Sequence, residues 1–144
     1  MTPDRPLRRD EPARLAVLAL GGGFVALGAL FIAVPRAGAA LFGLSPPEGE
    51  ALLYLPAIGL RDVAFGLYLV GLALFSTRRA TGIVLAVTVL IPLGDMALVA
   101  FGRGLSGYLV VHLISGLVVG GAGAWLLAGS GRSATDNSTG EDPA

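Results

Sequence analysis

Four ionisable residues interrupt the apolar stretches of this sequence. Arg61 and Asp62 stand in the middle of YLPAIGLRDVAFGLYLV, Asp95 lies in IPLGDMALVAF, and His112 lies in GYLVVHLISGL. A histidine beside a carboxylate can exchange a proton near neutral pH. An arginine can bind a carboxylate, phosphate or phenolate head group. These residue types predict a polar site that binds a small amphiphilic molecule and moves protons.

Two further polar residues share the helical face of His112. Tyr108 precedes it by four positions and Ser115 follows it by three, which are the spacings of one helix face. We predict Asp95 and His112 as the proton-exchanging, catalytic pair. The predicted ligand-binding residues are Arg61, Asp62, Tyr108 and Ser115.

The elements that must position these residues are transmembrane helices. Of the 144 residues, 54% are apolar and only 14% are charged, whereas a soluble domain carries about 25% charged residues. Apolar stretches of about 20 residues recur four times, and each is long enough to cross a bilayer. We predict helices over residues 13–34, 52–75, 81–101 and 108–128, the third interrupted near its far end by Pro92. Residues 36–50 form an interfacial connecting segment, stopped by two prolines.

The arginines predict how the chain is oriented in the cell membrane. One side of the membrane has seven, at positions 5, 8, 9, 14, 78, 79 and 132, and the other side has Arg36 and Arg103. Both termini are therefore expected in the cytoplasm, and short loops give an antiparallel, all-α, four-helix transmembrane bundle. Residues 1–12 would form a polar cytoplasmic arm, residues 13–128 the membrane domain, and residues 129–144 a disordered cytoplasmic tail.

Helix direction predicts that the ionisable residues share one depth. Arg61 lies about nine residues from the outer end of its helix, Asp95 about six, and His112 four to seven, at about 1.5 Å per residue. Arg61 follows a stripe with Tyr54, Ile58, Phe65 and Tyr68, while Asp62 shares a smooth face with Gly59 and Gly66. Because neighbouring residues point about 100° apart, we do not expect Arg61 and Asp62 to form a simple mutual salt bridge.

Charged side chains at this depth in the membrane are energetically unfavourable, so a structural or functional role must account for them. Each costs about 2.5–3.5 kcal/mol at the centre of a membrane helix. Intramembrane ionisable residues are by default functional, although a buried ion network can instead fix helix register. We favour a site that binds a lipophilic small molecule and transforms it by isomerisation or cyclisation. The alternatives are a proton-coupled transporter and a non-catalytic accessory subunit. Transport is disfavoured because the inner half offers only Ser76, Thr77, Thr81 and Thr88 as polar residues.

Composition also limits the partners. The formal net charge is zero, so no basic surface suggests nucleic acid. The chain has no cysteine, and we find no HExxH motif, phosphate loop or nucleophile elbow. One histidine and two intramembrane aspartates make a poor metal site, so we predict neither a metal nor a cofactor. Gly116, Gly120 and Ala124 are spaced four apart, a small-residue stripe that could pair two copies of the chain.

Three segments also carry a resemblance. At GLRDVAFGL, LIPLGDMALV and HLISGL the sequence resembles a family of small four-helix integral membrane proteins of bacteria and fungi, catalogued as a domain of unknown function. The resemblance covers most of residues 13–128 and implies the topology given above, but no activity. The residues that carry it are Gly59, Arg61, Asp62, Gly66, Pro92, Gly94, Asp95 and His112.

Overall fold

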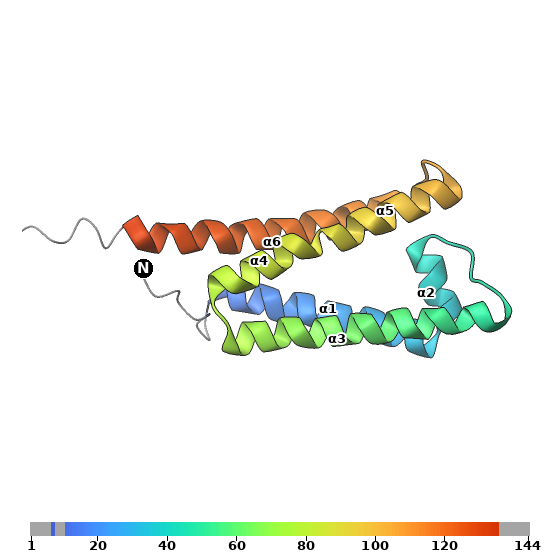
Figure 1. The fold of residues 1–144 in the computed structure, drawn as a ribbon, viewed down its shortest axis with the longest axis horizontal. Helices are drawn as coiled ribbons and strands as arrows, with labels where there is room; N and C mark the ends of the chain where they lie inside the picture. The colour runs from blue at the N-terminus through green and yellow to red at the C-terminus, as the bar shows by residue number, and fades with distance from the viewer. Residues whose placement is uncertain (1–6, 8–10, 136–144) are drawn as a thin grey trace, which may run out of the picture.

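The computed structural model describes Leu7 and residues 11–135, with side chains as far as Gly129. Every regular element in this part of the chain is a helix. Four segments are long and apolar enough to cross a membrane: Pro12–Ala33, Gly49–Phe75, Arg78–Arg103 and Leu109–Gly129. The predicted all-α, antiparallel four-helix transmembrane bundle is therefore confirmed, and it consists of two helical hairpins (Figure 1).

The first hairpin pairs α1 (Pro12–Ala33) with α3 (Tyr54–Phe75). Two glycine pairs set their spacing. A Cβ added to Gly66 would lie 2.5 Å from the carbonyl oxygen of Gly21, and one added to Gly28 would collide with the carbonyl oxygen of Gly59. Only glycine lets the two backbones come this close. The prediction that Gly59 and Gly66 form a face for another helix is confirmed.

The second hairpin pairs α4 (Arg78–Thr88) and α5 (Leu90–Arg103) with α6 (Leu109–Thr135). Here glycines of α6 face the chain itself, because Gly120 lies against Val89 and Gly116 against Pro92. Two of the three residues predicted to pair two copies are therefore used inside one copy. Ala124, the third, is exposed.

The helix break between α4 and α5 lies earlier in the chain than the sequence predicted. It occurs at Val89, in the middle of the span, not near the far end. Proline has no backbone N–H and its ring crowds the carbonyl four residues earlier, which for Pro92 is that of Thr88. The disturbance therefore appears one turn before the proline itself.

The two ends of the chain also differ from prediction. The helix α6 continues to Thr135, past the predicted end at residue 128, and residues 136–144 lie outside the described part. In the predicted polar arm, Pro12 begins α1, as suits a proline at a first helical position. Leu7 is buried, and its N–H donates to the carbonyl of Ser76 at 3.4 Å. The rest of the arm lies outside the described residues.

One short helix stands across the end of the bundle where the hairpins separate. The helix α2 (Pro35–Phe42) lies in the predicted connecting segment and is followed by the 3-10 turn η1 (Gly49–Leu53) (Figure 1). It ends at Gly43, whose φ of +96° is a left-handed conformation that favours glycine. Phe31, Ala39 and Leu55 form a small core that holds α2 on the first hairpin.

The opposite end joins the two hairpins. A larger core there combines Val17, Leu69, Leu85 and Leu126 from four helices. Beside it, Arg78 pairs with Glu11 and donates through Nε to the carbonyl of Leu126 at 3.1 Å. The bundle is thus fastened at the Arg78 end, while at the α2 end the ionisable residues lie where the hairpins separate.

Candidate functional site

Asp95 and His112 come together from neighbouring helices. Asp95 Oδ2 on α5 lies 3.9 Å from His112 Nδ1 on α6. Only 8% of the His112 side chain is exposed, and 24% of that of Asp95. The separation is within ion-pair range but longer than a hydrogen bond. The structure therefore brings the two predicted proton-exchanging side chains together in a largely buried position.

The third element at this site is α2. His112 Nε2 lies 2.9 Å from the carbonyl oxygen of Phe42, the last residue of α2, and the two rings meet edge to face with centroids 4.7 Å apart. A carbonyl oxygen only accepts hydrogen bonds, so Nε2 must carry the proton and donate. This contact orients the imidazole and leaves Nδ1 facing Asp95.

That tautomer has a chemical consequence. A neutral imidazole with its proton on Nε2 presents a bare lone pair at Nδ1, and an ionised Asp95 would present a second acceptor to it. Two acceptors facing each other at a largely buried site repel, and a proton on the carboxyl or on Nδ1 would remove that repulsion.

Arg61 and Asp62 contact each other, contrary to what the sequence predicted. Arg61 Nε lies 3.8 Å from Asp62 Oδ1, because the long arginine side chain can bend back across the roughly 100° between neighbours. Both residues lie within electrostatic range of Asp95, but no hydrogen bond or ion pair among the described residues joins them to it. Asp62 is mostly buried, whereas 65% of the Arg61 side chain is exposed. Arg61 and Asp62 thus form a second charged pair, on α3, near the Asp95–His112 pair.

Tyr108 and Ser115 lie less centrally than predicted. Tyr108 is 41% exposed and packs over Gly43, and the guanidinium of Arg103 lies 5.3 Å from its ring centroid. Ser115 is half-buried, and no contact among the described residues joins its hydroxyl to the Asp95–His112 pair. Tyr108 thus lines the α2 end of the site, while Ser115 is placed on the same helix without a visible role.

Sequence reasoning missed the contribution of α2. Besides the Phe42 carbonyl, Ser45 just beyond α2 accepts a hydrogen bond from Arg103 Nη2 at 3.0 Å. The sequence does contain a signal for this helix, because a proline at the first helical position, here Pro35, and a glycine just past the last one, here Gly43, are typical of helix ends. The backbone carbonyl itself carries no sequence signal.

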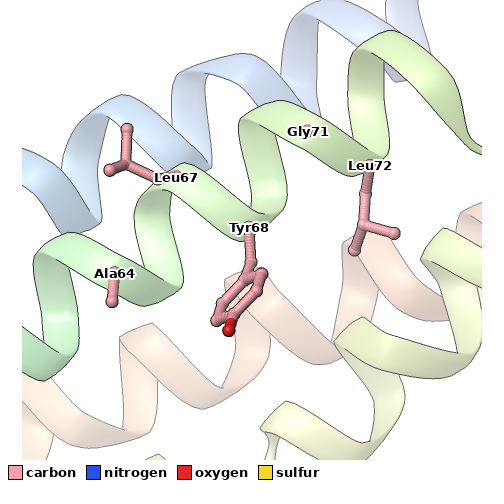
Figure 2. Close-up of a pocket in the computed structure, with 5 residues that line it drawn as sticks. All are labelled: Ala64, Leu67, Tyr68, Gly71 and Leu72. Carbon is pink, nitrogen blue, oxygen red and sulfur yellow. The ribbon is translucent and has the colours of Figure 1, made fainter.

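An apolar depression lies along α3, beginning one turn from Arg61. It is open, encloses about 470 Å³, and is lined by Ala64, Leu67, Tyr68, Gly71 and Leu72. Figure 2 shows Ala64, Tyr68 and Leu72 projecting from the same side of this helix. Tyr68 shares the face of Arg61, seven positions along. The polar group and the depression are therefore neighbouring parts of one helix surface.

No metal-binding arrangement is visible in these surroundings. Among residues 11–129 and Leu7, no three histidine, aspartate or glutamate side chains are grouped so that they could hold a metal ion. The arrangement offers hydrogen-bond donors, a histidine beside a carboxyl group and an apolar surface.

Comparison with protein families finds one match. The model of the domain of unknown function DUF4267 matches residues 21–126, which is most of the chain and includes all six candidate site residues. The chain belongs to this family. The DUF4267 match starts within α1 and ends within α6, so the matched region holds α2 and the Asp95–His112 pair. Comparison with curated proteins and with solved structures finds no match.

Proposed function

We propose that this membrane protein binds a lipophilic small molecule at Arg61, Asp62, Asp95 and His112 and transforms it by acid–base chemistry. The observation that carries the proposal is the position of His112 between the Phe42 carbonyl and the Asp95 carboxyl. A purely structural histidine needs one hydrogen-bond partner. This one has a partner that fixes its tautomer and lies 3.9 Å from a carboxyl group with which it would share a proton, an arrangement suited to isomerisation or cyclisation.

The proposed orientation follows the arginine distribution, with both termini in the cytoplasm of a cell-membrane protein. The site then lies in the outer half of the bilayer. Lipophilic ligands dissolve in the bilayer, so they would reach Arg61 and the α3 depression laterally, without crossing the polar surface of the membrane.

Transport receives less support than binding. The hydroxyl of Thr81 donates to the carbonyl of Thr77 at 2.8 Å, and that of Thr88 donates to the carbonyl of Val84 at 2.7 Å. Both threonines are buried and satisfied within their own helix. They do not supply the chain of polar groups that a proton path toward the Arg78 end would need.

Co-purification tests the proposed function. We would extract protein in mild detergent and compare its bound lipophiles by mass spectrometry for wild type, Asp95→Asn and Arg61→Leu. Arg79→Gln is the matched control, because Arg79 is an exposed arginine at the opposite end of the bundle. We expect one class of lipophile to be enriched on wild type and Arg79→Gln and depleted on the other two variants. An identical lipid profile on all four proteins would contradict the proposal.

A further inference from the structure

The charges of the site determine what kind of head group it can accept. Arg61 and Asp62 carry opposite charges and contact each other. In the function proposed above, Asp95 and His112 hold one proton between them, so they are either a carboxylate with an imidazolium or two neutral groups. The four residues together are neutral in both arrangements. An anionic head group would therefore leave an unbalanced negative charge at hydrocarbon depth, where each charge is costly.

Arg61 nevertheless has donors to offer. Its Nε lies 3.8 Å from Asp62 Oδ1, which is beyond hydrogen-bond distance, so this contact leaves guanidinium N–H groups without an acceptor. Its side chain is 65% exposed within a membrane-spanning segment, where water does not satisfy N–H groups. A neutral oxygen acceptor on a ligand would satisfy these donors without changing the net charge of the site.

The apolar part of the ligand has a place on the same helix. The depression lined by Ala64, Tyr68 and Leu72 starts one turn from Arg61 and ends about 16 Å from it along the axis. Its volume of about 470 Å³ falls within the roughly 300–1,000 Å³ of small-molecule sites. No charged side chain lines it, so it suits a hydrocarbon body.

We propose, building on the function proposed above, that the ligand is an uncharged lipophilic carbonyl compound. Its oxygen accepts hydrogen bonds from Arg61, and its hydrocarbon body lies in the α3 depression. In the reaction, a C–H bond beside the carbonyl breaks and its electron pair forms the C=C bond of an enolate. The enolate oxygen is stabilised by Arg61, and the proton goes to the Asp95 carboxylate. Where the ligand carries a C=C bond next to that carbon, the enolate extends over it as a dienolate, and return of the proton from Asp95 to the far carbon shifts the double bond and gives an isomer.

Three probes of matched chain length separate head-group chemistry from simple hydrophobicity. We would measure the binding of 2-dodecanone, dodecane and dodecane-1-sulfonate to the full chain in nanodiscs of uncharged lipid, from the rise in melting temperature with probe concentration. The ketone should bind about tenfold more tightly than the alkane, as expected for hydrogen bonds to a charged donor. The sulfonate should bind no better than the alkane.

Matched glycine variants locate the hydrocarbon body. A side chain added at Gly71 meets nothing within 4 Å, so Gly71→Leu should fold and fill the depression. Gly22 on α1 is equally open and lies outside the depression, so Gly22→Leu is the control. Gly71→Leu should remove the preference for the ketone, as should Arg61→Leu, while Gly22→Leu should retain it. Arg61→Gln, which keeps a donor, should retain part of it.

The contrary outcomes distinguish the two proposals. If the sulfonate binds most tightly, the uncharged carbonyl ligand is excluded while a lipophile site at Arg61 stands. If Gly71→Leu binds the ketone as wild type does, the depression does not hold its body. If the ketone binds no better than dodecane, or no probe binds, the carbonyl ligand is excluded and the proposed function loses its support as well.

Discussion

His112 connects three helices through its two ring nitrogens. Its Nε2 satisfies the last carbonyl of α2, on Phe42, while its Nδ1 faces Asp95 on α5. The carbonyls at a helix end have no partner inside the helix, so this histidine also caps α2. His112 thus makes a structural contact with the Phe42 carbonyl and lies beside Asp95, with which we propose that it exchanges a proton. Substitutions at His112 can separate these two roles.

Replacing His112 by phenylalanine should destabilise the bundle. The buried Phe42 carbonyl would lose its donor, at a cost of about 1–3 kcal/mol. Glutamine retains an N–H donor, so His112→Gln should lose clearly less while still losing proton exchange. Unfolding free energies in mixed micelles would measure both variants. Equal stability of His112→Phe and wild type would show that the Phe42 contact contributes nothing.

At the residue scale, the sequence predicted that Asp95 and His112 lie close together, but it did not predict how the other charged side chains make contact. Asp95 and His112 could be paired in advance because helix direction and residue spacing fix their depth. The contact between Arg61 and Asp62 could not, because side-chain bending is decided by what surrounds the guanidinium. The Phe42 carbonyl could not either, since every residue has one.

Glycine contacts decide how the helices pair. In the first hairpin, α1 and α3 meet through Gly21 with Gly66 and Gly28 with Gly59, backbone against backbone. The stripe of Gly116 and Gly120 on α6 instead faces side chains of the second hairpin, those of Pro92 and Val89. Glycines that look alike in the sequence therefore differ in effect, according to whether a neighbouring backbone lies beside them.

Gly28→Ala should push α1 and α3 apart, because its Cβ would collide with the carbonyl oxygen of Gly59, which cannot move aside as a side chain can. We expect a loss of about 1–3 kcal/mol. Gly22→Ala, on the same helix with open space around it, should be neutral or slightly stabilising. Thermal melts of both variants in one detergent provide the comparison. Similar melting temperatures would contradict the close α1–α3 contact.

At the element scale, hydropathy located the four spans to within a few residues, because length and apolar content alone define a membrane helix. It missed α2, which is too short to span and is held by tertiary contacts with Phe31 and His112. It also placed the break in the third span at Pro92, whereas the helix is interrupted at Val89. The sequence shows where the proline is, but not at which residue the helix is interrupted.

The two hairpins are held together at the Arg78 end of the molecule and are separated at the α2 end. Arg78 joins the first hairpin, through Glu11, to α6, through the carbonyls of Leu126 and Trp125. Val17, Leu69, Leu85 and Leu126 form a common core beside it. The hairpins separate at the α2 end, where the site that we propose would open to the bilayer.

Arg78→Ala should weaken the union of the two hairpins. It removes an ion pair and two charge-assisted hydrogen bonds, so we expect a loss of about 1.5–3 kcal/mol or more. Arg79→Ala removes the same charge from an exposed neighbouring position and should change stability by less than about 0.5 kcal/mol. Chemical denaturation of the two variants would measure the loss of unfolding free energy that each substitution causes. A smaller effect at Arg78 than at Arg79 would refute the fastening role.

Membrane orientation can be measured directly, because the chain has no cysteine of its own. A cysteine at Leu105, which is 96% exposed in the turn before α6, should react with a membrane-impermeant maleimide in intact cells. A cysteine at Arg79, an exposed position in the first turn of α4, should react only after the cells are opened. The reverse pattern would invert the orientation and place the site in the inner half of the bilayer.

The central proposal is that Asp95 and His112 share a proton, and nitrogen NMR of the single histidine tests it most directly. Selective ¹⁵N labelling of the purified protein gives two imidazole signals, both from His112. We predict a protonated Nε2 in wild type and in Asp95→Asn, and a Nδ1 signal that shifts when Asp95 is replaced. A bare Nε2, or a Nδ1 signal that Asp95→Asn leaves unchanged, would contradict the account.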